Sequence, residues 1–279
     1  MYVPVSVVIP CYCCEDTIER AVVSVMSQTA LPGEVILVDD ASPDHGRTLS
    51  KLQELQERFR DKAHLEIIAL KNNGGPSVAR NAGWEAATQP YIAFLDADDA
   101  WHPQKLEIQY RWMKEHPEVA LTGHKCVWVK ESDGQPKIEV ATNVKGYDVK
   151  YIKTCSLLRS NHFSTRSVML KKDLPFRFEP QKRHSEDYFL WLRIAMSGYQ
   201  CAVLDKPLAY VYKAPYGEDG LSADLWAMEK GELDTYFRLY KERYINFSSL
   251  LFLNLYSVVK FCRRVVIVYL RKAARILLR

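Results

Sequence analysis

Strand-like and helix-like segments alternate four times over the first 116 residues of this 279-residue chain. Each strand-like segment is a short run rich in β-branched residues, and each helix-like segment has apolar residues at helical spacing. One strand-and-helix unit takes about 30 residues, which predicts a parallel, doubly wound sheet. The predicted strands and helices are, in order, 3–9, 16–27, 34–38, 47–60, 65–70, 76–87, 91–95 and 103–115.

The pattern loosens after residue 116, where the predicted elements are shorter and less regular. Two strands, 119–130 and 137–141, flank Asp133-Gly134, which is typical of a hairpin turn. A further strand is expected at 167–171 and a helix at 186–196. Because the chain has no Gly-, Ser- or Pro-rich linker and no internal repeat, the simplest organisation is one mixed-sheet domain followed by a helical tail.

Charge is distributed unevenly along the chain. The net charge is +4, and residues 245–279 alone carry seven Lys or Arg and no acidic residue, so the remaining body is slightly acidic. A nucleic-acid-binding protein would carry a basic surface with interleaved aromatic residues, and no such segment occurs in the body. We therefore expect no nucleic-acid partner.

Three of the seven cysteines, Cys11, Cys13 and Cys14, lie directly after the first predicted strand. A structural zinc site would need a second ligand pair at a suitable spacing, which is lacking, so zinc is not expected there. Residues 1–10 lack the basic segment and long apolar run of a secretory signal. We therefore expect a reducing, cytoplasmic compartment in which the thiols are small packing residues.

The fourth predicted strand ends in three carboxylates within four positions, Asp96, Asp98 and Asp99. Side chains two apart on an extended backbone point the same way, so Asp96 and Asp98 can converge on one point. Clustered carboxylates repel one another unless a cation lies between them, and oxygen ligands suit Mg²⁺ or Mn²⁺. This strand end is therefore predicted to be a metal-assisted site. The alternative is a polar loop that caps the strand and starts the next helix.

The first and second predicted strands also end in polar groups. Pro10, Cys11 and Tyr12 follow the first strand, and Asp39 and Asp40 end the second. Because the carboxyl ends of parallel strands lie along one edge of a sheet, these positions are expected to share a crevice with the acidic cluster. Asp39 or Asp40 could accept hydrogen bonds from a ribose or a base. The alternative for both is a strand-end Asx turn.

A glycine-proline segment opens the third predicted helix. Asn73-Gly74-Gly75-Pro76 precedes Arg80, which lies one helical turn further in. Glycines permit close backbone approach, a helix N-terminus favours an anion, and a guanidinium can pair with phosphate oxygens. The alternative is an ordinary helix start with a solvated arginine. Neither a dinucleotide fingerprint nor a Walker loop follows the first strand, because the required glycine spacings are absent.

The segment His184-Ser185-Glu186-Asp187 precedes a helical pattern of apolar residues. Ser185 is predicted to cap this helix, with Glu186 and Asp187 in the first turn, where acids complement the helix dipole. The functional interpretation is a general base, a carboxylate that accepts a proton from a reacting hydroxyl. Both interpretations can hold together, because a cap fixes the position of the neighbouring acid.

Taken together, these segments resemble the inverting glycosyltransferases of family 2, which have the GT-A fold. The resemblance covers residues 3 to about 213, and it is specific because the motifs follow one another in the family's order and spacing. The matching residues are Val7-Val8-Ile9-Pro10, Ser24-Val25-Met26-Ser27-Gln28-Thr29, Val38-Asp39-Asp40-Ala41-Ser42-Pro43-Asp44, Asn73-Gly74-Gly75, Ala79-Arg80-Asn81-Ala82-Gly83, Leu95-Asp96-Ala97-Asp98-Asp99 and Ser185-Glu186-Asp187.

The resemblance implies a donor site at the sheet edge. Asp39 and Asp40 would hold the nucleoside of a nucleotide-sugar, and Arg80 would hold its diphosphate. Asp96 and Asp98 would form the family's DXD motif, and Asp98 is the residue of the two that is expected to bind Mn²⁺ or Mg²⁺ directly. Further donor contacts are expected from Pro10, Tyr12, Asn73, Gly75 and Lys213.

The resemblance also implies an acceptor side. Asp187 matches the family's catalytic base, and Glu186 would lie beside it at the acceptor site. The chain departs from the family at Cys13, where many relatives have Asn. It also departs at Tyr212-Lys213, where relatives often have Tyr-Arg followed by a His. The sequence therefore gives no support for a metal or phosphate contact from residues 214–222.

The resulting prediction is a metal-dependent glycosyltransferase that builds a bacterial surface polysaccharide or lipid-linked glycan. It would move a sugar from a nucleotide-diphosphate donor, with a UDP-sugar favoured, to a hydroxyl of a glycan or lipid-linked acceptor. The alternatives are a non-catalytic sugar-nucleotide-binding assembly subunit and a nucleotidyltransferase. The intact Arg80, Asp98 and Asp187 argue against the first, and the lack of a Gly-rich loop after the first strand argues against the second.

The predicted domain spans residues 1–222, with a nucleotide-binding half at 1–116 and an acceptor half at 117–222, and a helical region follows at 223–279. The longest charge-free run of this region, 244–259, is too short for a transmembrane helix. A basic, apolar helix without acids is typical of a helix lying on an anionic membrane surface. We therefore expect peripheral contact with the cytoplasmic face of the inner membrane. The alternative is packing on the body or on a second subunit, and the oligomeric state stays open.

Overall fold

The computed structural model describes residues 1–129, 148–212 and 224–277. The strands are β1 (Tyr2–Cys11), β2 (Leu31–Asp39), β3 (His64–Ala69), β4 (Tyr91–Phe94), β5 (Ala100–Trp101), β6 (Val119–Trp128), β7 (Val149–Tyr151), β8 (Met169–Lys171) and β9 (Gln200–Val211). The helices are α1 (Ile18–Met26), α2 (Arg47–Phe59), α3 (Pro76–Ala86), α4 (Lys105–Glu115), α5 (Thr154–Leu157), the 3₁₀-helix η2 (Thr165–Ser167), α6 (Glu186–Met196), α7 (Leu225–Lys241) and α8 (Phe247–Leu277).

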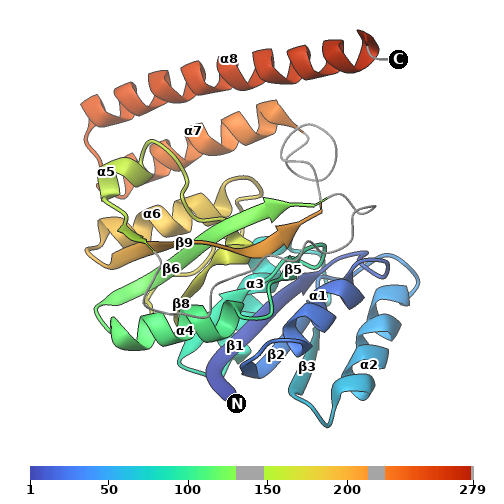
Figure 1. Ribbon diagram of the computed structural model, residues 1–279. Coiled ribbons are helices and arrows are strands. Elements are labelled where there is room, and N and C mark those ends of the chain that lie inside the picture. The colour runs from blue at the N-terminus through green and yellow to red at the C-terminus, as the bar shows by residue number, and fades with distance from the viewer. Residues whose placement is uncertain (130–147, 213–223, 278–279) are drawn as a thin grey trace.

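The strands of the described residues form one sheet in the order β3-β2-β1-β4-β8-β6-β9-β5, with β7 paired to β9. Helices lie on both faces of this sheet (Figure 1). The strands β3, β2, β1 and β4 are parallel. β8 is antiparallel to β4 and β6, β6 is parallel to β9, and β9 is antiparallel to β5 and β7. The mixed sheet flanked by helices confirms the predicted fold class.

The register of the parallel strands aligns their carboxyl ends. Cys11 at the end of β1 pairs with Asp39 at the end of β2, and Asp39 pairs with Ala69 at the end of β3. The polar groups that follow these strands therefore lie along one edge of the sheet, as the alternating pattern predicted. The predicted strands and helices of this half match β1–β4 and α1–α4.

The second half matches the predictions in part. The strands predicted at 119–130 and 167–171 correspond to β6 and β8, and the helix predicted at 186–196 is α6. The strand expected at 137–141 and the turn at Asp133-Gly134 lie outside the described residues.

The sequence patterns do not predict β9, which is parallel to β6 and pairs with it along most of its length. Its sequence contains Asp205, Lys206 and Pro207, and its register with β6 shifts near Pro207. Proline cannot donate to a strand ladder, and the shift interrupts the alternation of buried and exposed side chains. A strand of twelve residues therefore lacks the period that would identify it.

The sheet separates two apolar cores. One core lies against α1, α2 and α4, and the other lies against α3, α6 and α7. α3 lies so close to β1 that a Cβ on Gly83 would be 2.4 Å from Cγ1 of Val8. Because any larger side chain would displace α3, Gly83 lets this helix lie directly against β1.

α7 and α8 form a further layer over α6 (Figure 1). α8 packs on α7, and Leu250, Leu253 and Ser257 are buried. One face of α8 therefore packs on the body, which was one of the alternatives for the tail. No helix of the described residues is both long and apolar enough to cross a membrane. The opposite face of α8 is exposed and apolar, and its large residues are Phe247, Leu251, Phe252, Leu255, Val258, Val259 and Val266.

Candidate active site

The carboxyl ends of the parallel strands open into a cavity of about 1070 Å³, here called the sheet-edge cavity. Segments around η2 and before α6 contribute to its lining. Asp39 is not among the described residues that line it, and Lys213 lies outside the described residues. The predicted site residues that do line it are Pro10, Tyr12, Asp40, Asn73, Gly75, Arg80, Asp96, Asp98, Glu186 and Asp187.

The loop after β1 forms one end of the sheet-edge cavity. Tyr12 is 51% exposed, so its ring is available to stack on a planar ligand group next to Pro10. Cys13 has a φ of +45°, a conformation that Asn tolerates well, so the departure from the family at Cys13 concerns the shape of the loop. The Cys13 N–H donates to Oγ of Ser42 (3.0 Å), which donates to Oδ1 of the buried Asp39 (2.5 Å). Asp39 is therefore held by the Ser42 hydroxyl within the loop that follows β2.

The carboxylate of Asp40 organises the loop before α3. Oδ1 of Asp40 accepts from the N–H of Gly74 (2.8 Å), and Oδ2 accepts from the N–H of Gly75 (2.7 Å) and from Nδ2 of Asn73 (3.0 Å). Gly75 has a φ of +81°, a backbone conformation that glycine adopts at little cost and other residues adopt only with strain. The anion expected at the start of α3 is therefore Asp40 itself, and it occupies amides that a phosphate could otherwise use.

Arg80 joins the acidic strand end to α6. Its Nη2 donates to Oδ1 of Asp96 (2.9 Å), and its Nη1 donates to Oε1 of Glu186 (3.0 Å). Arg80 is buried, and the two carboxylates raise its pKa against the effect of burial, so it stays charged. Both ends of the guanidinium fork are used within the protein. The arginine predicted to hold a diphosphate is thus a link between the two halves of the site.

A second arginine, Arg166 in η2, was not singled out by the sequence. Its Nη1 lies 2.6 Å from Oδ2 of Asp99, and its Nη2 lies 3.7 Å from Oδ2 of Asp96. Asp99 is almost fully buried, and burial raises its pKa while Arg166 acts in the opposite direction. Asp99 therefore fixes Arg166 at the wall of the sheet-edge cavity. No local pattern marks Arg166, because its partners lie about 70 residues earlier in the chain.

Asp98 is a carboxylate of the cluster that could hold a divalent cation. It lines the sheet-edge cavity, and its backbone oxygen accepts from Nη2 of Arg20 (2.7 Å), which fixes the loop. Asp96 faces the guanidinium groups of Arg80 and Arg166. Within the described residues no three His, Cys, Asp or Glu side chains form a metal cage. Mg²⁺ does not need such a cage, because it keeps several waters and binds through one or two carboxylates plus substrate phosphates.

Asp187 lies in the first turn of α6 and has the properties of a general base. Its Oδ2 accepts from Oγ1 of Thr165 (3.2 Å), and its Oδ1 accepts from the N–H of Tyr188 (2.6 Å). Burial, and next the charge of Glu186, raise the pKa of Asp187 to about 6. A carboxylate with this pKa is ionised at neutral pH and still basic enough to accept a proton.

Ser185 was predicted to cap α6, and the structure confirms its position but not a capping hydrogen bond. Ser185 occupies the N-cap position, but its side chain makes no cap hydrogen bond. Its φ is +56°, a left-handed conformation that costs free energy in a residue other than glycine. The strained residue directly precedes Glu186 and Asp187, so the backbone turns sharply where the two carboxylates enter the site.

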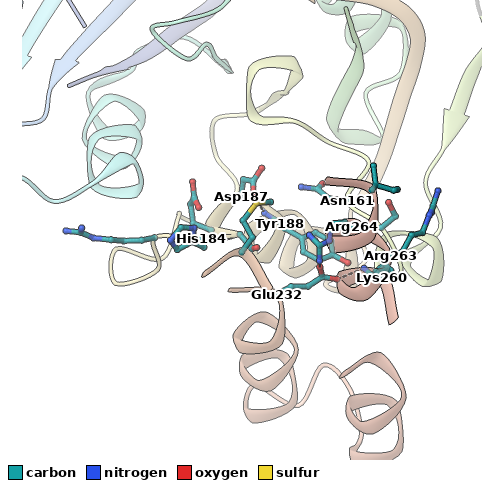
Figure 2. Close-up of a pocket in the computed structure, with 14 residues that line it drawn as sticks. Asn161, His184, Asp187, Tyr188, Glu232, Lys260, Arg263 and Arg264 are labelled. Carbon is teal, nitrogen blue, oxygen red and sulfur yellow. Dashed lines mark hydrogen bonds and ion pairs between the residues drawn. The ribbon is translucent and has the colours of Figure 1, made fainter. Parts of the chain in front are cut away.

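A second cavity of about 610 Å³, here called the helix-layer cavity, lies where α6, α7 and α8 meet. Figure 2 shows Asp187 on one side of it and Lys260, Arg263 and Arg264 of α8 on another. Four residues line both cavities, so the two hollows adjoin at the start of α6, and these residues are Asn161, Arg183, Glu186 and Asp187.

Comparison with solved structures defines the class of fold. Residues 1–349 of TarS from S. aureus superpose with a TM-score of 0.63 at 18% identity, over 91% of this chain and 70% of that one. A mannosyltransferase from Pyrobaculum calidifontis, PcManGT, gives a TM-score of 0.61 at 20% identity, over 99% of this chain and 81% of that one. The chain spans 39% of a longer TarS chain. The fold is the GT-A fold of glycosyltransferases.

Comparison of sequences gives the family. The model of glycosyl transferase family 2 matches residues 6–174, and the chain belongs to this family of enzymes. TuaG of Bacillus subtilis (strain 168), whose name refers to teichuronic acid biosynthesis, is 31% identical over 74% of this chain and 77% of its own length. WfgD of Escherichia coli is 30% identical over 68% of this chain and 69% of its own length. The predicted family and the predicted transferase activity are confirmed.

Proposed function

We propose that the enzyme moves a sugar from a UDP-sugar to a hydroxyl of a lipid-linked or glycan acceptor, with inversion, in bacterial surface polysaccharide synthesis. The names of similar proteins support these substrate classes. WfgD is named a UDP-Glc:α-D-GlcNAc-diphosphoundecaprenol β-1,3-glucosyltransferase. TarS has been crystallised with UDP and with UDP-GlcNAc, and PcManGT with GDP-Man and Mn²⁺.

The observation that carries this proposal is the position of Asp187 between two cavities. The sheet-edge cavity has the size and polar wall that a nucleotide-sugar needs, and the helix-layer cavity gives access to the same carboxylate from the other side. A donor in the first cavity and an acceptor in the second would meet at Asp187. An attack from the face opposite the leaving group requires this arrangement.

The reaction is a single displacement. The acceptor hydroxyl gives its proton to Asp187, and its oxygen forms a bond to the anomeric carbon. The bond between that carbon and the diphosphate oxygen breaks on the opposite face, and the nucleoside diphosphate leaves. Thr165 and the Tyr188 N–H hold the carboxylate of Asp187 in position, while Glu186 keeps its pKa high.

On the donor side, Pro10 and Tyr12 provide the surface for the base. Arg166 is a better candidate than Arg80 for contact with the diphosphate, because Arg80 already uses both ends of its guanidinium. Asp98 would hold the divalent ion. When bound, Mn²⁺ or Mg²⁺ would neutralise the charge that develops on the departing diphosphate.

The family match bears on the two alternatives. Membership in an enzyme family argues against a non-catalytic assembly subunit. Such a subunit would also not need a carboxylate held in the position of a general base, as Asp187 is. A nucleotidyltransferase would need a phosphate-binding amide loop, whereas the amides of Gly74 and Gly75 are held by Asp40. Glycosyl transfer is therefore the function that we retain.

We further propose that α8 lies on the cytoplasmic face of the inner membrane. Its face opposite α7 is apolar and exposed, with Leu251 and Leu255 each more than 60% exposed. The chain from residue 245 onward contains no acidic residue. Burial of such a face in the interface of an anionic bilayer would be favoured both by its apolar area and by its charge.

The proposal is tested by single-turnover transfer with a panel of UDP- and GDP-sugars and lipid-linked acceptors, with the anomeric configuration of the product read by NMR. A UDP-sugar should be consumed and the configuration inverted. The Asp98→Asn variant should lose about 10²-fold or more in rate, and Mn²⁺ should no longer strengthen UDP binding to it. The exposed Asp173→Asn is the matched control. Retention of configuration, or an Asp98→Asn enzyme that still responds to Mn²⁺, would contradict the proposal.

A further inference from the structure

The helix-layer cavity is unusually rich in cationic side chains. Lys260, Arg263 and Arg264 project from α8, and Arg183 comes from the segment before α6. Figure 2 shows the α8 side chains gathered along one wall of the hollow. None of these residues belongs to the motifs that relate the chain to its family, and of the four only Arg183 also lines the sheet-edge cavity.

Two of the four cations are held by acids of α7. Lys260 forms an ion pair with Glu232, and Nη2 of Arg264 lies 2.8 Å from Oε2 of Glu229 and 3.4 Å from Oε2 of Glu232. Glu229 is buried, and Lys260 also donates to the backbone oxygen of Arg159. These contacts fasten α8 to α7, and they fix the wall of the cavity in one position.

The other two cations have no acidic partner among the described residues. Arg183 and Arg263 are both exposed, and no hydrogen bond or ion pair to either guanidinium is formed within that part of the chain. They line the same cavity as Asp187. Arg263 lies on the α8 wall that the ion pairs of Lys260 and Arg264 hold in place, and its guanidinium without an acidic partner would accept the oxygens of an anion that enters the cavity.

The surroundings of Arg263 indicate which anion. Val259 and Val266, one helical turn away on either side, belong to the exposed apolar face of α8. Ile267 and Met228 add apolar surface to the cavity lining. A ligand that fits this border would have an anionic group beside an apolar chain, with its reacting hydroxyl directed toward Asp187.

We propose that the helix-layer cavity binds the diphosphate that links an acceptor sugar to its lipid, through Arg263. This inference rests on the proposed function, in which the acceptor approaches Asp187 from this side. α8 then has two roles, because one edge of it recognises the acceptor diphosphate while its apolar face meets the bilayer that carries the lipid. The acceptor is thereby narrowed from any glycan to a lipid-linked diphosphate.

The test is calorimetric binding of farnesyl diphosphate, below its micellar concentration and without membranes, to the full chain. Arg263→Glu should weaken this binding about tenfold, since an exposed charge-assisted contact is lost and a like charge replaces it. Lys230→Glu is the matched control, because Lys230 is exposed on α7, lies over Trp226 and does not line the cavity. It makes the same charge change and should alter binding less than twofold.

Equal loss of binding in the two variants would overturn the proposal, since the effect would then be one of net charge. It would also be overturned if Arg263→Glu bound farnesyl diphosphate normally but bound phosphatidylglycerol vesicles poorly, because Arg263 would then meet lipid headgroups. UDP binding, measured on the same samples, distinguishes a failure of the proposed function from a failure of the proposed acceptor site. A wild-type chain that binds no nucleotide refutes the proposed function. Unchanged UDP binding with unchanged diphosphate binding by Arg263→Glu refutes the acceptor site alone.

Discussion

The sheet-edge cavity and the helix-layer cavity adjoin at Asp187 but are built in opposite ways. The acids of the sheet edge, Asp96 and Asp99, follow one strand, and arginines from distant segments hold them. In the helix layer three of the four cations belong to one helix, α8, and acids of α7 hold two of these three. The first cavity thus pairs carboxylates with arginines, whereas the second has on its α8 wall an arginine, Arg263, without an acidic partner among the described residues.

The difference indicates a division of labour. The strand ends are fixed by the ladder of the parallel sheet and by the close contact of Gly83 with β1, so the donor side is rigid. The wall of the helix-layer cavity depends on how α8 packs on α7. Substitutions there can change what the cavity binds without disturbing the sheet, so acceptor choice is expected to reside in this layer.

The largest effect is expected at Asp187, one of the four residues that line both cavities. Asp187→Asn should lower transfer by about 10³-fold, because the amide cannot accept the proton of the attacking hydroxyl. UDP binding should stay within twofold of wild type, since the donor contacts lie on the sheet side. Single-turnover transfer and calorimetry measure the two quantities, with Asp173→Asn as the exposed control. A loss of UDP binding equal to the loss of transfer would show that the two cavities are not functionally distinct.

The next effect concerns the link between the two regions. Arg80→Met should lower the free energy of unfolding by about 3 to 5 kcal/mol, because Asp96 and Glu186 lose a buried partner. In a double-mutant cycle, Glu186→Gln should recover part of this loss. Urea denaturation measures both, and Arg58→Met, at an exposed pair with Glu19, should cost under about 1 kcal/mol. Equal costs at Arg80 and Arg58 would mean that the two regions are not coupled through Arg80.

The parallel half of the fold could be predicted because each of its features is local. A β-branched run and the apolar spacing of the following helix each lie within about 12 residues. Asp40, Asp96 and Asp98 likewise lie at strand ends, and the parallel topology brings them to one edge. The prediction of a site at this edge needed only these local patterns and the order of the motifs.

The rest could not be predicted, because it depends on partners far apart in the chain. Arg166 is recognisable as a site residue only through its contacts with Asp96 and Asp99. That Arg80 connects the acidic strand end to α6 is visible only once Glu186 is seen beside it. The tail showed its basic charge but not that Arg264 would reach Glu229 of α7. Conformation mattered as well, since the left-handed Ser185 makes no cap bond despite its favourable residue type.

The smallest of the ranked effects is expected at the outer face of α8. Leu251→Ser together with Leu255→Ser should reduce flotation with phosphatidylglycerol vesicles roughly tenfold, because exposed apolar area is lost from the face opposite α7. The thermal midpoint should hardly change, since both side chains are exposed in the free protein. Phe237→Ser, at an exposed residue of α7, should leave flotation unchanged. Equal flotation of all three proteins would refute membrane contact through α8.

In the proposed mechanism Asp187 is the base at which donor and acceptor meet, so the pH dependence of transfer should follow the protonation of this carboxylate. Burial and Glu186 raise the pKa of Asp187 to about 6, and only the deprotonated form can accept a proton. With both substrates saturating, the single-turnover rate should therefore rise with pH, reach half of its plateau near pH 6, and stay level above about pH 7. A rate that is independent of pH from about 4.5 to 8, or one that falls as pH rises through 6, would contradict the account.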